Sequence, residues 1–355
     1  MKIAIIVGAR PQFIKMAVIH RALQKYNEEN HSKPIRETLI HTGQHYDYGM
    51  SQVFFDDMVL PEPDINLNIH SSFQGEMTGA MITSLEKELL ANRPDCVLIF
   101  GDTNSTLAGA LAAAKLHIPI AHIESGLRSF NKKMPEEINR IVVDCISDFL
   151  FCPCQNAQSQ LKKENVSGKI FLSGDVMYDS FLHYQDRAMK PDLKESFALA
   201  TLHRAENTDD PRRLNSIFSA LEKCPIPVII PLHPRTKKEI KKNRITLSRH
   251  IKATDPLSYF SMLGHLASCS FVITDSGGLQ KEAYFSEKPC VTIRDETEWV
   301  ELVNHGFNKL VGSFEENSES VYKWAQRPIE KFEKIYGDGN AGEIILKTII
   351  LFSLY

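Results

Sequence analysis

Short apolar runs alternate along this chain with longer segments of helical pattern, and that alternation restricts the possible folds more than any other feature. Most of the runs are rich in Ile, Val, Leu and Phe and do not alternate apolar with polar residues, which is typical of strands buried on both faces. Repeated strand–helix–strand units with parallel sheets produce this pattern. The sequence predicts strands over residues 2–7, 38–41, 97–100, 118–123, 149–152, 169–172, 197–201, 227–231, 271–274 and 290–293.

Helical patterns follow most of these runs, and the chain length predicts two α/β domains. At about 150 residues per domain, 355 residues are enough for two separate cores. We expect a doubly wound domain over residues 1–175, a second over 176–330, and a helical tail over 331–355 docked on one of them. Ligands bind beyond the carboxyl ends of the strands in such sheets. The predicted helices are 11–26, 105–116, 135–147, 211–222, 259–267 and 279–285, and residues 322–355 also have a helical pattern.

Composition and charge exclude several classes of protein. Hydrophobic residues make up 43% of the chain and charged residues 24%, which is typical of a globular protein. The net charge is -3 and no long basic run stands out, so we expect no nucleic-acid partner. The longest apolar stretch, 344–355, is too short to span a bilayer. Seven cysteines and no secretory-type cleavage pattern indicate reduced thiols and a cytoplasmic location.

The turn after the predicted strand 271–274 is the clearest candidate binding site. Asp275-Ser276-Gly277-Gly278 joins that strand to a helical pattern. Two glycines let a ligand approach the backbone closely, and a helix N-terminus attracts anions. Glu282, one turn into the helix, could accept hydrogen bonds from ribose hydroxyls. An ordinary N-terminal cap by Asp275 or Ser276 is the alternative interpretation.

Two cations follow the first predicted strand. Arg10 lies at the strand–helix junction and Lys15 lies about one turn further on. Together they could neutralise a diphosphate. Two solvated surface cations are the alternative.

Three carboxylates follow strands or begin a helix in the first predicted domain. Asp102 and Glu124 come directly after apolar runs, and Glu136 lies in the first turn of the helix predicted at 135–147. Several carboxylates that converge on one site suit proton transfer. The alternatives are a helix cap for Asp102 and a helical salt bridge to Arg140 for Glu136 or Glu137.

Two histidines follow neighbouring strands of the second predicted domain, each with an arginine close behind. His203 precedes Arg204, and His233 lies two residues before Arg235. The repeated pattern favours an anion-facing surface, in which His203 could carry a proton. The spacing does not fit a zinc site, and we expect no metal.

Taken together, these segments resemble the non-hydrolysing UDP-N-acetylglucosamine 2-epimerase family. The resemblance covers nearly the whole chain in order. It is carried by the runs GARPQFIK, HTGQHYD, GDTNSTLAGALAA, HIESGLRSF, MPEEINR, LHRAEN, LHPRT, TDSGGLQKEA and YGDGNAGE.

The resemblance implies two Rossmann-like domains in the glycosyltransferase-B arrangement, and a homodimer. It implies interconversion of UDP-GlcNAc and UDP-ManNAc for surface polysaccharide synthesis, by anti elimination of UDP to a 2-acetamidoglucal and re-addition, without metal or nicotinamide. It assigns UDP and phosphate binding to Arg10, Lys15, Ser276, Gly277, Gly278 and Glu282, to which we add His233. It assigns acid–base roles to Asp102, Glu124, Glu136 and His203.

Three departures from the family pattern bear on the substrate. Trp299 stands where the family usually has an arginine after Thr-Glu. The GARPQF start, the HTGQHYD run and the segment before Glu136 look more like the branch that acts on UDP-2,3-diacetamido-2,3-dideoxyglucuronate. The basic residue of the bacterial allosteric site has no match near residues 70–75, so activation by substrate is not expected. A retaining glycosyltransferase of the same architecture and a non-catalytic sugar-nucleotide sensor remain as alternatives.

Overall fold

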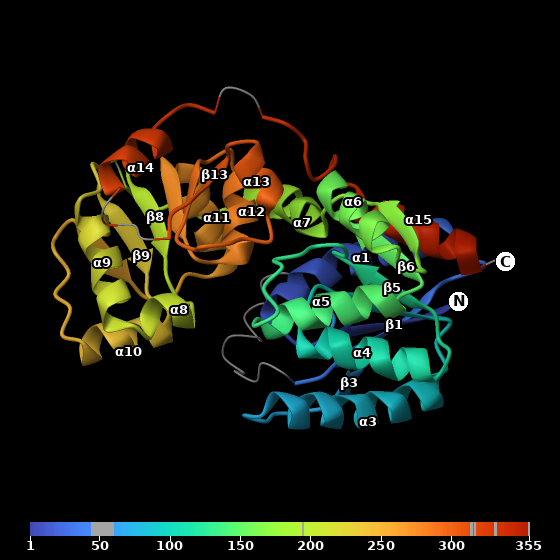
Figure 1. Cartoon of the computed structure of the whole chain (residues 1–355). Helices are drawn as coiled ribbons and strands as arrows, with labels where there is room; N and C mark the ends of the chain where they lie inside the picture. The colour runs from blue at the N-terminus through green and yellow to red at the C-terminus, as the bar shows by residue number, and fades with distance from the viewer. Residues whose placement is uncertain (44–59, 194, 313–314, 316, 330–331, 354–355) are drawn as a thin grey trace. The chain divides into compact units, whose positions relative to one another are not determined.

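The computed structural model describes residues 1–43, 60–193, 195–312, 315, 317–329 and 332–353, apart from a few side chains that include that of Arg10. The chain divides into two compact units. Unit 1 comprises Met1–Leu182 together with Lys334–Tyr355, and unit 2 comprises His183–Glu333. Each unit is an α/β fold built on one parallel sheet, as the sequence predicts (Figure 1).

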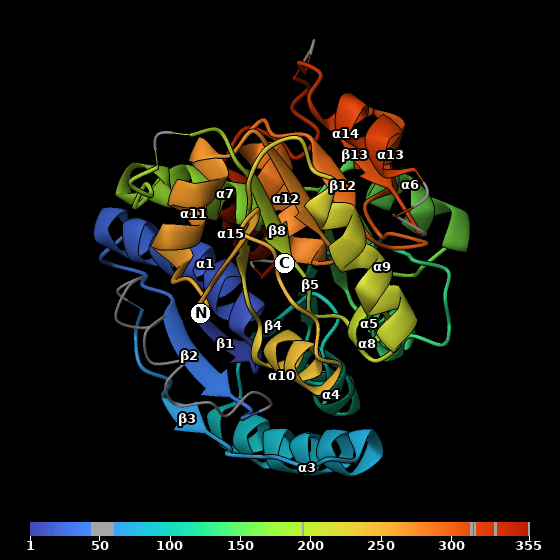
Figure 2. The ribbon, with the colours of Figure 1, turned by 90° about the vertical axis from the view of Figure 1, so that its left-hand side faces the viewer.

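Unit 1 is built on a seven-stranded parallel sheet with the order β3-β2-β1-β4-β5-β6-β7. Its helices cover both faces, and α3 runs beside α4 on one of them (Figure 2). The strands are β1 (Lys2–Val7), β2 (Arg36–His41), β3 (Ile65–Asn66), β4 (Cys96–Phe100), β5 (Ile120–Ile123), β6 (Phe149–Cys152) and β7 (Lys169–Leu172). The helices are α1 (Arg10–Glu29), α3 (Gln74–Asn92), α4 (Asn104–Lys115), α5 (Pro135–Ile146), α6 (Gln155–Glu164), α7 (Val176–Tyr184) and α15 (Ala341–Ser353).

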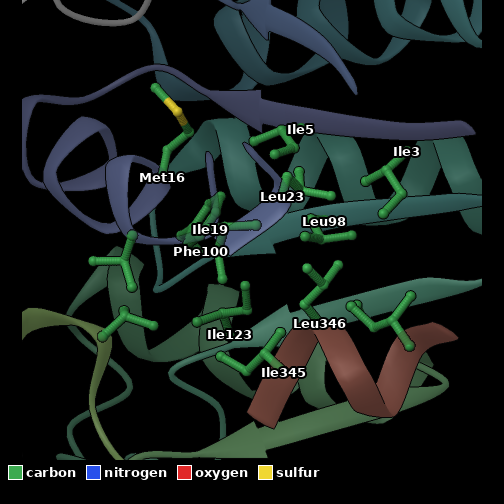
Figure 3. Close-up of a cluster of buried hydrophobic side chains, with 14 of the residues drawn as sticks. Ile3, Ile5, Met16, Ile19, Leu23, Leu98, Phe100, Ile123, Ile345 and Leu346 are labelled. Carbon is green, nitrogen blue, oxygen red and sulfur yellow. The ribbon is translucent and has the colours of Figure 1, made fainter. Parts of the chain in front are cut away.

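The first strand shows why the apolar runs lack alternation. Ile3 and Ile5 pack into a core with α1 and α15, while Ala4 and Ile6 pack into a second core with α3 and α4. Successive side chains of a strand point to opposite faces, so a strand covered on both faces is apolar at every position. Burial of each large aliphatic side chain stabilises the fold by about 1.5–3 kcal/mol. Figure 3 shows Ile345 and Leu346 of α15 inside the first of these cores.

Unit 2 repeats the design with a six-stranded parallel sheet in the order β10-β9-β8-β11-β12-β13. One face packs on α9 and α14 and the other on α11 and α12. Its strands are β8 (Ala198–Thr201), β9 (Val228–Pro231), β10 (Ile251–Thr254), β11 (Phe271–Thr274), β12 (Cys290–Thr292) and β13 (Asn308–Leu310). Its helices are α8 (Ala205–Thr208), α9 (Pro211–Glu222), α10 (Pro234–Lys242), α11 (Tyr259–Ser268), α12 (Gly277–Phe285), α13 (Val300–Asn304) and α14 (Ser318–Ala325).

Both sheets reverse their strand order at one point. In unit 1 the chain turns outward in opposite directions from the β1–β4 pair, and in unit 2 from the β8–β11 pair. The crevice at such a reversal is where open α/β sheets bind ligands. We therefore look for the binding and catalytic residues directly after β1, β4, β8 and β11.

One expectation about the end of the chain is wrong. Residues 322–355 do not form a continuous helical segment, because α14 ends at Ala325 and α15 begins only at Ala341. Pro328 lacks an N–H and disfavours a helix, while Gly337 and Gly339 adopt positive φ angles of 87° and 81°. Helix α15 packs on unit 1, and among the described residues no helix is long and apolar enough to cross a membrane.

Candidate functional site

A glutamine fixes the two strand ends that flank the order reversal of unit 1. Gln12 Oε1 accepts hydrogen bonds from the backbone N–H groups of Gly8 (2.8 Å) and Ala9 (3.0 Å). Its Nε2 donates to Phe100 O, at the end of β4, at 2.8 Å. Because the amide is buried and bonded on both sides, it fixes the ends of β1 and β4 relative to each other.

Lys15 and Glu124 form an ion pair beside this reversal. Lys15 lies on α1 and Glu124 directly follows β5, and both side chains are almost completely buried. Glu124 has a φ angle of 71°, which is uncommon for a residue with a side chain. Such strained residues cluster at functional sites, where the surrounding structure holds them in place.

Asp102 is held by an arginine and does not cap a helix. Its carboxylate accepts a hydrogen bond from Arg140 at 2.5 Å, while Thr103 caps α4 by accepting from the Thr106 N–H. Arg140 also donates to Glu137 at 2.8 Å. The interpretation of Asp102 as a helix cap is therefore wrong. The helical salt bridge considered for Glu136 or Glu137 forms between Glu137 and Arg140.

Glu137 ties the loop before α5 to the same arginine. It accepts hydrogen bonds from the N–H groups of Ser129 and Phe130, both at 2.9 Å. Although burial opposes ionisation, these donors and Arg140 hold the pKa of Glu137 below its ordinary value. Glu136, by contrast, is exposed in the first turn of α5, where its carboxylate is open to solvent.

In unit 2, Asp275 joins the ends of β8 and β11. It is fully buried and accepts hydrogen bonds from the N–H groups of His203 (3.0 Å) and Arg204 (2.9 Å) and from Asn207 Nδ2 (3.1 Å). His203 Nδ1 also lies 3.1 Å from its carboxylate. Although burial opposes ionisation, His203 and the other donors hold the pKa of Asp275 below its ordinary value. Asp275 is thus a link between two strand ends.

Ser276 caps α12, and Gly277 and Gly278 are the first two residues of that helix. Its hydroxyl accepts a hydrogen bond from the Leu279 N–H at 3.4 Å. Gly278 is exposed, and a Cβ added to it would meet nothing within 4 Å. At Gly277 a Cβ would lie 2.5 Å from Glu298 Oε1, so only glycine fits there without a shift. The turn offers open backbone N–H groups at a helix N-terminus, which suits a phosphate.

His233 lies beside His203. The two ring centroids are 5.5 Å apart. His233 caps α10 by accepting a hydrogen bond from the Arg235 N–H at 3.2 Å. Partial burial, followed by the charge of His203, lowers the pKa of His233. Glu282 is half-buried on α12, and the Arg10 side chain and residues 44–47 of the HTGQHYD run lie outside the described part of the chain.

Several supporting residues did not emerge from the sequence. Behind the α12 turn, Arg294 pairs with Glu298 at 2.8 Å, and both are almost fully buried. Lys281 lies over the Trp299 ring, 4.2 Å from its centroid. Charged residues that are this deeply buried are rare unless paired, and such pairs cannot be read from sequence spacing.

Comparisons with known proteins point to one enzyme family. The UDP-N-acetylglucosamine 2-epimerase family model matches residues 27–350. A UDP-2,3-diacetamido-2,3-dideoxy-D-glucuronate 2-epimerase from Pseudomonas aeruginosa is 49% identical over 98% of this chain and 99% of its own length. A UDP-N-acetylglucosamine 2-epimerase from Methanocaldococcus jannaschii is 40% identical over 98% of this chain and 99% of its own.

Solved structures give the same result. The M. jannaschii UDP-GlcNAc 2-epimerase in complex with UDP-GlcNAc and UDP superposes with a TM-score of 0.88 at 40% identity, covering 99% of this chain and all of that one. The Neisseria meningitidis UDP-GlcNAc 2-epimerase bound to UDP-GlcNAc gives 0.86 at 30% identity, with the same coverage. Because both its sequence and its fold match over nearly the whole length, this chain belongs to the UDP-N-acetylglucosamine 2-epimerase family.

Proposed function

We propose that this isomerase inverts C2 of a UDP-2-acetamido sugar. Asp102 and Glu124 carry the proposal. These two carboxylates follow adjacent strands, β4 and β5, and each is paired with a cation, Arg140 and Lys15 respectively. Carboxylates positioned beside a sugar can remove and return a weakly acidic proton.

Stabilisation of the leaving group is assigned mainly to unit 2. The open N–H groups of the α12 turn, with His203 nearby, would stabilise the negative charge of the departing UDP. Elimination breaks the C1–O bond to UDP and the C2–H bond together. One carboxylate takes the C2 proton, a second group of the acid–base set delivers its own solvent-exchangeable proton to the opposite face of C2, and UDP then adds back at C1. Asp102, Glu124, Glu136 and His203 are the proposed acid–base set, and Arg10, Lys15, His233, Ser276, Gly277, Gly278 and Glu282 the proposed UDP-binding set.

Two substrates are supported by different observations. The 49% relative acts, by its name, on UDP-2,3-diacetamido-2,3-dideoxyglucuronate, whose uronate adds a negative charge. Lys132 and Lys133 are exposed directly before the turn that carries Glu136, where such a charge could be met. The M. jannaschii relative, at 40% identity, supports UDP-GlcNAc. We infer that the diacetamidouronate is preferred and that UDP-GlcNAc is the second candidate.

Incubation with each sugar nucleotide in deuterated water tests both the inversion of C2 and the choice of sugar. NMR should show deuterium at C2 of substrate and product, with faster exchange for the preferred sugar. Asp102→Asn and Glu124→Gln should abolish the exchange while UDP still binds. Transfer of the sugar to an acceptor without C2 exchange would instead identify a glycosyltransferase, and binding of UDP without turnover would identify a sensor.

A further inference from the structure

His122 is a completely buried histidine whose two ring nitrogens both face hydrogen-bond acceptors. It lies on β5, and its Nε2 is 2.8 Å from the carbonyl oxygen of Gly101. Its Nδ1 is 2.7 Å from Asp144 Oδ1. A carbonyl oxygen can only accept, so Nε2 must carry a proton.

The Asp144 side of the ring requires a proton as well. Asp144 accepts two further hydrogen bonds on Oδ2, from Gly126 N at 3.1 Å and Arg128 at 2.7 Å. Both partners on Oδ2 are donors, and the guanidinium of Arg128 is permanently charged, so Asp144 acts as an accepting carboxylate. The carboxylate has no proton to donate, so Nδ1 also carries one. The ring is therefore a positively charged imidazolium that donates twice.

The charges around this ring balance, with Glu164 at the solvent-exposed end of the network. Arg128 donates to both oxygens of Glu164, at 2.9 Å and 2.6 Å, as well as to Asp144. His122 and Arg128 supply two positive charges, and Asp144 and Glu164 supply two negative ones. A buried charge is tolerated when it is paired and bonded in this way.

Both bonds of His122 end on loops of the candidate site. The Gly101 carbonyl belongs to the turn that presents Asp102, and Gly101 itself has a φ angle of 63°. Glu124 follows His122 by two residues and begins the loop that Asp144 holds through Gly126. One ring thus connects the loops that carry both carboxylates.

We propose that His122, as a buried cation, is the positioning residue that holds the Asp102 turn and the Glu124 loop in their reactive arrangement. The inference rests on the proposed function of those two carboxylates. A displacement of about 1 Å at a reacting group can cost about 100-fold in rate. Loss of His122 should therefore lower kcat through geometry, although the ring does not touch the substrate.

Two neutral variants separate the two bonds. His122→Gln places its amide N–H near the Nε2 position and can still reach the Gly101 carbonyl, whereas His122→Asn places it near Nδ1 and can reach only Asp144. We expect kcat for C2 exchange to fall about 100-fold in His122→Asn and about 10-fold in His122→Gln. The KM and the UDP affinity should change far less than kcat in both, since the two hydrogen bonds of His122 go to Gly101 and Asp144, which are not in the proposed UDP-binding set.

His20 offers a matched control. Its Nδ1 lies 2.7 Å from Glu37 and ties α1 to β2 in the same unit. His20→Gln and His20→Asn should lower the Tm and leave kcat unchanged. Equal kcat values for wild type and both His122 variants, with only the Tm lowered, would show that His122 is merely structural and overturn the proposal.

The charge is tested without any turnover. In ¹⁵N NMR of the intact wild-type protein, both ring nitrogens of His122 should be protonated, with the signals assigned by their loss in His122→Gln or their shift in Asp144→Asn. One unprotonated ring nitrogen would overturn the cation whatever the substrate is. Absence of C2 exchange in the wild type would refute the proposed function, and the NMR result would still decide the state of the ring.

Discussion

Asp275 lies 3.1 Å from His203 Nδ1 and also accepts the His203 backbone N–H, so one buried carboxylate orients both the ring and the main chain of that residue. The pairing makes Nδ1 the donor to Asp275 and leaves Nε2 to face away from it. His203 is thereby prepared to meet a phosphate or to carry a proton.

Asp275→Asn should remove this orientation. An amide can offer its N–H to Nδ1 and reverse the ring tautomer, so we expect turnover to fall about 100-fold and UDP to bind about 10-fold more weakly. Isothermal titration calorimetry and the C2-exchange assay measure the two effects. Asp209→Asn, which changes an exposed partner of Arg235, should leave both values within about twofold. Unchanged affinity and rate in Asp275→Asn would contradict the role of the pair.

Gly278→Ala should weaken UDP binding without loss of stability. The added Cβ meets no protein atom within 4 Å, so a fall in affinity would report contact with the ligand itself. We expect the Tm to be nearly unchanged and the Kd for UDP to rise about 10-fold. Gly277→Ala should instead lower the Tm, because its Cβ would press on Glu298. Gly79→Ala, at another open position, is the control for both variants. Normal UDP binding by Gly278→Ala would show that the phosphate does not bind at this turn.

Arg140→Lys should impair catalysis more than folding. A lysine keeps the positive charge but cannot bridge Asp102 and Glu137 as the planar guanidinium does. We expect kcat to fall at least about 10-fold, with UDP affinity unchanged. Arg235→Lys changes an arginine–aspartate pair on the surface of unit 2 and serves as the control. Equal losses in the two variants would argue against a specific role for Arg140.

Asp179→Asn should stabilise the protein at high pH. Asp179 accepts a hydrogen bond from Gly342 N at the start of α15, and burial raises its pKa to about 6. Since the folded state holds this proton more tightly than the unfolded chain, stability is greatest at low pH and declines as the pH rises toward 6. At high pH the free energy of unfolding of the wild type is therefore lower by up to about 3 kcal/mol, a loss that the variant avoids.

Thermal unfolding at pH 4.5 and pH 8 measures this effect. Because the unfolded carboxyl has the ordinary pKa of 3.8, about a third of the effect is already present at pH 4.5, so the Tm of Asp179→Asn should exceed that of the wild type clearly at pH 8 and only slightly at pH 4.5. Asp338→Asn, at an exposed carboxylate paired with Lys334, should show no such difference between the two pH values. A lower Tm for Asp179→Asn at pH 8 would mean that the charged form is the stable one.

The sequence predicted the central strands and the edge strand β7 well, but it missed the edge strands β3, β10 and β13. Strands such as β1 and β11 are buried on both faces, so their apolar runs stand out. Strands β3 and β13 have two and three residues, and β10 has two exposed positions, so none has a recognisable run. Their place in the sheet depends on pairing with a neighbour, which is not a local property.

Helix α3 was not among the predicted helices for a similar reason. Phe73 stands at its N-cap, and two glycines lie in its first turns, which weakens the local signal. Its buried residues Met77, Met81, Leu85 and Leu89 recur every four positions, and that spacing could have identified it.

The strand-end carboxylates and the glycine turn could be located from the sequence, but their partners could not. Arg140 was recognised as a possible partner of Glu137, three residues away, because that spacing brings side chains together on a helix. Its bond to Asp102 joins residues 38 positions apart. Contacts of that kind follow from the strand order, which the sequence pattern left undetermined.

The return of α15 to unit 1 has a consequence for how the protein is made. Ala341, Ile345, Leu346 and Ile349 of α15 belong to a core whose other buried members lie before residue 180, and the whole of unit 2 is encoded between the two groups. During synthesis, unit 2 can complete its own core while one layer of unit 1 still exposes an apolar face to solvent and to chaperones. Synthesis of unit 1 begins before that of unit 2 and ends after it. An mRNA truncated before codon 341 would therefore yield a complete unit 2 joined to a unit 1 that lacks α15 and cannot complete its core.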